Sequence, residues 1–442
     1  MMSQRVPGVS LEKDYRPRPP ELVTGVPVFL GFAPKDNDSE IQVVSPKWIN
    51  NSQPEETDNG QTNSVDPVLF THWSEFESTF RSLDSALAFA VRGFFENGGS
   101  QCYVQLMSST EDNRKAALVA ALKTLTEPDV FDLICAPDIF SPNDLQPLQG
   151  NIGKPEERWL KVSTSLDDVV ELQAKILGHC ADIGCFAILD AHPTTEPHDH
   201  RQAVASAVAA STCTDVPRTR TDIQSDPLGA GALYYPWIQL PASDQDSEPG
   251  FKFVPPCGHI AGIYSRSDRQ HGVHKAPANE PLMGVYDLSS DIPDAQLASL
   301  YVEGVNCLRV FPHRGIRVWG ARTLSGEYIN VKRLFLTVAR WIEHNLAGVV
   351  FEPNTPQLWA RVERELTAYL NGLFQQGALQ GRAAQDAFYV RCNAETNPRE
   401  LHDLGQVVTK IGLAPATPNE FIEVRIVQTP SGVTMNGLNR PE

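Results

Sequence analysis

Two patterns in this 442-residue chain predict its fold class. Between residue 115 and about residue 265, apolar helical and strand-like segments alternate, which is typical of a layered α/β domain. After residue 301, two amphipathic helices precede several short strands, which favours an α+β domain. A chain of this length accommodates two to four domains. The sequence therefore predicts a multidomain protein of the α/β and α+β classes, with extended terminal arms.

Changes in composition along the chain suggest where the domains begin and end. Residues 34–66 are polar and rich in turn formers, so they lack the apolar area needed to order themselves and form a surface insertion. We expect an N-terminal arm at 1–22, an α+β segment at 23–110 that contains this insertion, an α/β domain at 111–300, an α+β domain at 301–428 and a C-terminal tail at 429–442.

The N-terminus has the alternation of a strand. Val9, Leu11 and Tyr15 would share one face, and Pro17-Arg18-Pro19-Pro20 then interrupts the pattern. This segment is either a strand of the main sheet or an arm that pairs with another subunit. The next predicted elements are strands at Thr24–Phe32 and Ile41–Val44, a helix at Leu83–Phe95 that ends at Asn97-Gly98-Gly99, and a strand at Cys102–Leu106.

The middle of the chain contains the predicted α/β alternation. Helices are expected at Ala116–Leu125, Leu166–Ile183 and Arg201–Ala210, and strands at Val130–Ala136, Cys185–Asp190, Leu233–Leu240 and Ile260–Tyr264.

In the last domain, Asn330 is predicted to cap a helix whose apolar face includes Leu334, Val338 and Trp341. Thr355 and Pro356 would begin the next helix as N-cap and first residue. Strands should follow at Phe388–Asn393, Gln406–Leu413 and Glu420–Gln428, and the tail beyond Thr429 has little to pack.

Bulk composition narrows the functional classes. With 37 basic and 54 acidic residues the net charge is −17, which argues against coating nucleic acid. No apolar stretch approaches the roughly 20 residues that span a bilayer, and the start lacks the apolar core of a signal peptide. The eight cysteines form no CxxC pair, so they indicate buried thiols in a reducing cytoplasm.

The main candidate for chemistry is the group Asp190, His192 and His200, together with His198 and Asp199. Imidazoles and carboxylates this close can bind zinc, or supply part of a hydrolase triad. However, they are expected on a Pro- and Thr-rich loop, where such side chains are usually solvated. No GxSxG elbow or phosphate loop is present. We therefore expect no enzyme, no metal and no cofactor, with a hydrolase based on Asp190, His192 and His200 as the alternative.

A basic stretch stands out within this acidic chain. Seven cations lie between residues 309 and 345 against only Glu327 and Glu343, a local charge of +5: Arg309, Arg314, Arg317, Arg322, Lys332, Arg333 and Arg340. Two interpretations stay open. The cations pair internally with acids of the middle domain, or they form a face that binds an acidic partner.

Several short motifs, in order, resemble contractile tail sheath proteins of phage tails and bacterial injection systems. They are the N-terminal VPGVSLE, FFENGGSQCYV, AGIYSRSD, HKAPANEPLMGV, RGIRVWGARTLS, YINVKRLF, VFEPN and IGLAP, and the likeness covers most of the chain.

The resemblance implies a structural subunit of a sheath that polymerises helically around an inner tube and contracts. It implies a subtilisin-like middle domain, and terminal arms that add strands to neighbouring subunits, with Val9, Leu11 and Tyr15 at one end and Phe421, Val424 and Ile426 at the other. Arg314, Arg317, Arg322, Lys332 and Arg333 become candidates to face the tube. The implied partners are the chain itself, the tube protein, and baseplate and terminator or cap proteins, without nucleic acid or membrane insertion. The particle would lie in the bacterial cytoplasm or form a virion tail.

Overall fold

The computed structural model describes most of the chain. The described residues are 22–32, 67–80, 85–107, 114–126, 130–141, 144–145, 160, 162–211, 226–241, 251–349, 352–400, 406–418, 423–429 and 432–438. The expected N-terminal arm and the expected strand Ile41–Val44 lie outside these ranges.

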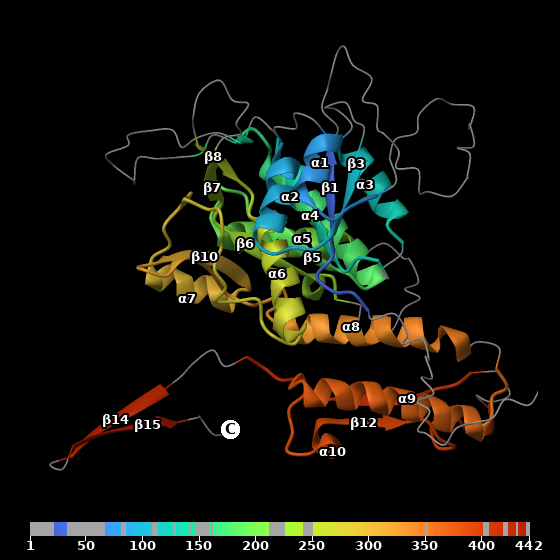
Figure 1. Cartoon of the computed structure of the whole chain (residues 1–442). Coiled ribbons are helices and arrows are strands. Elements are labelled where there is room, and N and C mark those ends of the chain that lie inside the picture. Colours follow the sequence, from blue (N-terminus) through green and yellow to red (C-terminus); the bar gives the residue numbers. More distant parts are fainter. Residues whose placement is uncertain are drawn as a thin grey trace, which may run out of the picture.

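A mixed sheet forms the centre of the main body (Figure 1). Its eight described strands follow the order β11 (Gly315–Trp319), β10 (Val305–Phe311), β6 (Gly231–Tyr235), β5 (Phe186–Asp190), β4 (Leu133–Cys135), β1 (Pro27–Phe32), β3 (Cys102–Met107) and β2 (Val68–Phe70). The six inner strands are parallel, and β2 and β11 run antiparallel at the two edges. Because helices cover both faces of a parallel sheet, β5 is buried along its whole length.

Two rows of helices cover the sheet. In the first row, α2 (Ala86–Glu96) packs on α6 (Cys257–His271) above β1, β4 and β5. The second row contains α3 (Arg114–Thr124), α4 (Leu166–Ile183) and α5 (Pro197–Ser211). The strands that follow β3 are added on the other side of β1, so the order of strands across the sheet reverses at this point. With right-handed crossovers, this reversal places the second row of helices on the opposite face of the sheet. The predicted strand within Thr24–Phe32, the helix end at Asn97-Gly98 and the helix Leu166–Ile183 are confirmed.

The prediction of a strand at Ile260–Tyr264 was wrong, because this segment lies within α6. A short apolar run cannot by itself be assigned to a buried strand or a buried helix. The backbone contacts show how this helix packs. A Cβ at Gly258 would lie 2.2 Å from the carbonyl oxygen of Ala90, and one at Gly262 would lie 2.5 Å from that of Phe94. The two glycines therefore let α6 approach the backbone of α2.

The predicted strand Leu233–Leu240 is two strands. After β6, Pro236 lacks the N–H that a continued ladder needs, and the chain turns. It re-enters as β7 (Ile238–Pro241) in a separate three-stranded sheet with β8 (Phe251–Val254) and β9 (Asp287–Leu288). Two further helices, α1 (Trp73–Thr79) and α7 (Asp294–Val302), pack at the periphery of the main body.

The expected domain boundaries at 110/111 and 300/301 need correction. The central sheet takes strands from all three of the expected segments, and one continuous core runs from Val26 to Leu336. Composition gave no sign of this, because parallel strands that are neighbours in a sheet are often distant in sequence.

Helix α8 (Ile329–Leu346) connects the main body to the C-terminal module (Figure 1). Ile329 and Leu336 belong to the core of the main body, whereas Leu334 and Val338 pack in a second core. That second core also contains α9 (Pro356–Gln375), α10 (Ala384–Ala387) and the antiparallel pair β12 (Phe388–Arg391) and β13 (Lys410–Leu413). The rings of Trp341 and Tyr369 stack between α8 and α9, with centroids 4.0 Å apart.

The two predicted helix starts had different outcomes. The hydroxyl of Thr355 accepts a hydrogen bond from the Leu358 N–H and Pro356 follows as the first residue, so the predicted start of α9 is confirmed. The predicted cap at Asn330 was wrong. This residue lies inside the first turn of α8, and its side-chain amide donates to the carbonyls of His274 and Ala416.

The end of the chain also differs from the prediction. Strand β14 (Glu423–Thr429) pairs with a second strand, β15 (Gly432–Leu438), in the tail that was expected to stay unpaired. The two strands run antiparallel, with Thr429 opposite Gly432 and Ile426 opposite Met435. In Figure 1 this hairpin stands apart from the α9 module.

The contact between α2 and α6 generates a prediction. Gly258→Ala should lower the free energy of unfolding by about 1–3 kcal/mol, because the added methyl meets the backbone of Ala90. Chemical denaturation measures the change. Gly178→Ala in α4 is the matched control, because a Cβ there meets nothing within 4 Å and the helix should gain up to about 1 kcal/mol. Equal stabilisation by both substitutions would contradict the close approach.

Candidate functional site

The group around Asp190 has a structural role at the ends of two elements. Asp190 ends β5, and its carboxylate accepts a 2.8 Å hydrogen bond from the backbone N–H of Cys257, the first residue of α6. A carboxylate at a helix N-terminus satisfies a free donor and interacts favourably with the helix dipole. Burial raises the pKa of Asp190 to about 7, which the hydrogen bonds from Cys257 oppose.

The histidines are also bonded within the chain. His200 Nδ1 accepts from the His192 backbone N–H at 2.8 Å, so its proton sits on Nε2, which lies 2.8 Å from Gln173 Oε1. Burial lowers the pKa of His200 to about 3, so the ring stays neutral. His192 Nε2 contacts the Thr164 carbonyl oxygen at 3.0 Å. These contacts fix the backbone and the two side chains. Both imidazole rings are therefore engaged within the chain, and neither is free to act as a base.

One expectation about this group was wrong. His198 and His200 do not lie on a loop, because α5 begins at Pro197 and includes them. Within the described residues, no cluster of three or more His, Cys, Asp or Glu side chains has the geometry of a metal site. In the same ranges, every helix is too short or too polar to cross a bilayer.

The basic stretch separates into exposed and buried members. In the β10–β11 hairpin, Arg309 lies directly opposite Arg317, and Arg314 is exposed at the turn. Arg309 pairs with Asp294, and Arg317 donates to the Asn279 carbonyl at 2.5 Å. Like charges that lie opposite each other on a ladder repel. This hairpin therefore carries a local positive charge, of which the pairing of Arg309 with Asp294 offsets only a part.

The remaining cations face inward. The guanidinium of Arg322 lies 3.8 Å from the ring centre of Tyr328 and 5.2 Å from that of Tyr301, to whose hydroxyl it also donates. Lys332 and Arg333 are buried, 7% and 3% exposed, so both were wrongly assigned to a tube-facing surface. Both residues lie on the face of α8 that packs against the main body. Of the five candidates, Arg314 is exposed, Arg317 and Arg322 are half-buried, and Lys332 and Arg333 are buried.

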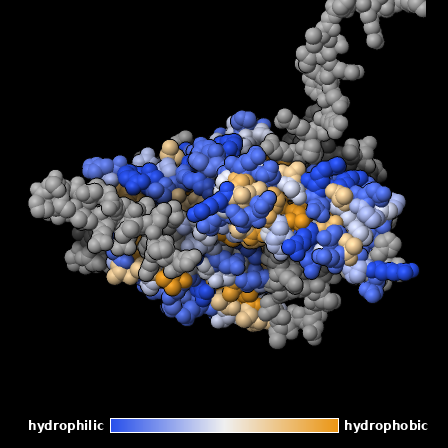
Figure 2. Space-filling view, turned by 90° about the horizontal axis from the view of Figure 1, so that it is seen from below, coloured by the Kyte–Doolittle hydropathy of each residue, from blue (hydrophilic) through white to orange (hydrophobic). Residues whose placement is uncertain are grey.

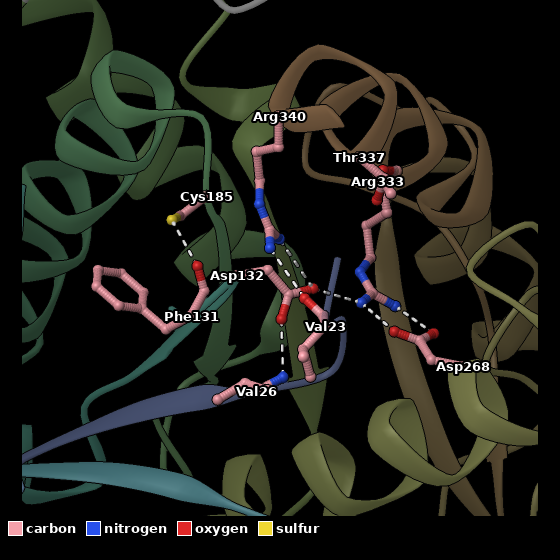
Figure 3. A network of polar contacts seen from close by, with 9 residues as sticks. All are labelled: Val23, Val26, Phe131, Asp132, Cys185, Asp268, Arg333, Thr337 and Arg340. Atoms are coloured by element: carbon pink, nitrogen blue, oxygen red, sulfur yellow. Dashed lines mark hydrogen bonds and ion pairs between the residues drawn. The ribbon is translucent and has the colours of Figure 1, made fainter. Parts of the chain in front are cut away.

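Arg333 is the centre of a buried polar network between α8 and the main body (Figure 3). Its guanidinium donates two parallel hydrogen bonds to Asp268 in α6, at 2.9 and 2.6 Å, and a third to Asp132 at 2.9 Å. Arg340, two turns further along α8, lies 4.0 Å from Asp132. Two guanidinium groups thus balance two carboxylates in a region excluded from water.

The same network reaches the first strand. Asp132 accepts a 2.7 Å bond from the backbone N–H of Val26, and Arg340 donates to the carbonyl of Val23 at 2.9 Å (Figure 3). Burial alone would lower the pKa of Arg333, but Asp268 and Asp132 more than offset this and raise it. The sequence gave one signal for this network: Arg333 and Arg340 are seven residues apart, on one face of a helix.

The C-terminal assembly candidates are only partly described. Val424 lies opposite Gly437 and Ile426 opposite Met435 in the β14–β15 hairpin, whereas Phe421 lies outside the described residues, as do Val9, Leu11 and Tyr15. Seen from below, where the C-terminal module lies, the coloured surface is mainly hydrophilic, with apolar residues in small groups (Figure 2).

Two family models match adjacent parts of this chain. The phage tail sheath protein central domain covers residues 162–324, and the phage tail sheath C-terminal domain covers residues 325–429. The chain belongs to the phage tail sheath protein family. The two matches meet between β11 and α8, close to where the main body gives way to the C-terminal module.

Curated relatives of this sheath family member include two tail sheath proteins. That of Vibrio phage KVP40 is 27% identical over 186 residues, and that of Salmonella phage ViI is 26% identical over 180 residues. These alignments span 40% and 37% of this chain but only 27% and 26% of the relatives. The chain thus covers about a quarter of the length of these curated relatives.

Solved structures resemble the chain over nearly its whole length. A chain of the anti-feeding prophage helical sheath in its contracted state is 25% identical, with a TM-score of 0.64, and the match covers 97% of this chain and 100% of that one. A chain of the anti-feeding prophage baseplate is 26% identical with the same TM-score and coverage. The contracted sheath of the PVC extracellular contractile injection system, at 24% identity and a TM-score of 0.62, has the same fold.

The buried network generates a prediction. Arg333→Leu leaves Asp268 and Asp132 in the interior without their main cation, and should lower the free energy of unfolding by about 3–5 kcal/mol. Arg333→Lys keeps the charge but not the planar fork, and should recover part of the loss. Chemical denaturation measures both.

Arg361→Leu is the matched control, because Arg361 on α9 pairs with Glu352 at the surface and its loss should change stability little. Equal effects of Arg333→Leu and Arg361→Leu would show that the buried pairs contribute no more than surface ones.

Proposed function

We propose that this chain is the structural subunit of a contractile sheath, which polymerises helically around an inner tube and contracts to drive that tube through a target envelope. The observation that carries the proposal is the combined match to the central and C-terminal sheath domains over residues 162–429. The likeness to a contracted sheath chain over 97% of this chain supports it.

The proposal assigns each part of the molecule a mechanical task. The main body is a rigid α/β block, which we compare with the subtilisin-like domain of sheath proteins on the basis of its mostly parallel sheet. The bidentate pair between Arg333 and Asp268 connects α8 to this block, so that the body and the C-terminal module swivel together during contraction. No enzymatic step is needed, because an extended lattice can store the free energy that contraction releases.

Joints between subunits are assigned to strands at the ends of the chain. The two-stranded sheet β12–β13 has two unpaired edges among the described residues, and an extended segment of a neighbour can add to such an edge. We assign this role to the N-terminal arm with Val9, Leu11 and Tyr15, and to the C-terminal strand with Phe421, Val424 and Ile426. A head-to-tail contact that does not close yields a helical polymer.

The partners follow from this role. They are other copies of the chain, the inner tube, the baseplate, and terminator or cap proteins. The chain would act in an assembled particle in the bacterial cytoplasm, or as part of a virion tail. The net charge of −17 gives no basis for binding nucleic acid, and no direct membrane insertion is assigned.

Electron microscopy of the purified full chain tests the proposal. A sheath subunit should form long striated tubes of constant diameter without any added nucleotide. Deleting residues 1–16 should leave the described core intact, with nearly unchanged thermal unfolding, while tubes give way to monomers or short oligomers. A full chain that stays monomeric at every concentration, with or without a tube to assemble on, would overturn the sheath role.

Two arginines of the β10–β11 hairpin, the exposed Arg314 and the half-buried Arg317, generate a second expectation. Reversing Arg314 and Arg317 to Glu should weaken assembly on an inner tube, and high salt should weaken assembly of the wild-type chain in the same way. The matched control is Arg361→Glu on α9, which changes a surface charge away from the hairpin. If the reversals unfold the protein instead, the arginines serve internal contacts and this part of the proposal fails.

A further inference from the structure

Helix α8 binds the chain at two places that are far apart in sequence, one next to each of the proposed arms. We call residues 23–26 the N-terminal root and residues 414–416 the C-terminal root, because each is a described segment next to one arm. The hydrogen bonds at the two roots show how the positions of the arms depend on one helix.

Arg340, in the C-terminal half of α8, holds the N-terminal root. Its buried guanidinium donates a 2.9 Å hydrogen bond to the carbonyl of Val23 (Figure 3). At the next residue, the hydroxyl of Thr24 bonds to the carboxylate of Asp268, which is itself bound to Arg333. Two consecutive residues of this root are therefore tied to buried side chains, although the side chain of Val23 is 48% exposed.

Asn330, in the first turn of α8, holds the C-terminal root. Its side-chain amide donates to the carbonyl of Ala416 at 3.2 Å, and to that of His274, which follows α6, at 2.8 Å. The N–H of Ala416 donates to the carbonyl of Ala378 in the C-terminal module at 3.0 Å. Asn330 is 2% exposed, so bulk water does not compete for its amide. One buried side chain thus connects the C-terminal root to the main body.

The length of helix between these two residues sets the separation of the roots. Asn330 and Arg340 are ten residues apart, which corresponds to about 15 Å along the axis of α8. Between them, Leu336 packs in the core of the main body and Val338 in the second core. A helix held by two cores does not slide or bend freely, so the roots keep a fixed distance from each other.

We propose that α8 is the common anchor of both terminal arms, with Asn330 and Arg340 as the positioning residues that fix where each arm leaves the body. An arm loses conformational freedom when it adds to the sheet of a neighbour, and a fixed root removes part of that cost in advance. Tension on one arm also reaches the other arm through a single helix. The inference rests on the proposed function, which assigns the arms to joints between subunits, and adds the element that connects the joints.

The separation of the roots can be measured in the unassembled chain. Val23→Cys and Thr417→Cys provide two exposed positions for spin labels, one at each root. The native cysteines of the described ranges are buried, and Cys213→Ser removes the remaining one. Pulsed electron paramagnetic resonance should then give one narrow distribution of distances between the labels.

Loss of either anchor should broaden this distribution by several ångströms. Asn330→Leu keeps the approximate size of the side chain but removes the donor to Ala416. Arg340→Met removes the donor to Val23 while Arg333 keeps its place in the buried network. In both variants the critical concentration for tube formation, measured by sedimentation, should rise about fivefold or more, because assembly must order the freed residues again.

Asn345→Leu is the matched control. It makes the same change in the same helix, at a residue whose amide donates to the carbonyl of Trp341 one turn earlier in α8. This substitution should change neither the distance distribution nor the critical concentration.

The outcomes separate the anchor from the sheath role. A broad distribution in the wild-type chain, or a narrow one that neither variant changes, would overturn the anchor. If one variant unfolds, the other decides; unfolding of both would overturn the anchor, because the two residues would then serve the core and not the arms. Broadening without any effect on tube formation would also overturn it, since the joints would then be independent of the roots. A wild-type chain that forms no tubes would overturn the proposed function, whereas the distance measurement would still decide whether α8 fixes the two roots.

Discussion

The bidentate bond between Arg333 and Asp268 is the interaction on which the arrangement of this molecule depends. It joins α8 to α6, and the third bond to Asp132 extends the connection to the start of β4 and to the backbone before β1. Burying two carboxylates and two guanidinium groups is favourable only when their hydrogen bonds are satisfied together. Another orientation of α8 would break these hydrogen bonds and leave charged groups buried without partners. A purely apolar contact between α8 and the main body would define the orientation less sharply, because it has no such directional bonds.

Helix α8 transmits this constraint to the rest of the chain. One of its faces packs in the core of the main body through Ile329 and Leu336, and another packs on α9 through Leu334, Val338 and the stacked ring of Trp341. A helix shared by two cores leaves little freedom between them. In a sheath that contracts by rigid-body rotation, this would let force from one subunit contact reach the next without being lost in internal bending.

The polar groups at the ends of the central strands have the same character. Asp190 holds the N-terminus of α6, while His200 connects His192 to Gln173, so residue types common in active sites here fix loops and helix ends. A mostly parallel sheet often supports catalysis at the carboxyl ends of its strands, but the fold does not require it. In this sheath family member those positions stabilise the block.

The sequence alone determined the elements whose signals are local. The apolar period defined α4, Thr355 and Pro356 defined the start of α9, and the ordered motifs defined the family resemblance. Tertiary structure decided what depends on distant partners. The helix that contains Ile260–Tyr264 packs directly on the α2 backbone through Gly258 and Gly262, and Arg333 is buried because Asp132 and Asp268 lie opposite it. Local patterns report a residue's neighbours in sequence, whereas the burial of a charge and the close approach of two backbones depend on neighbours in space.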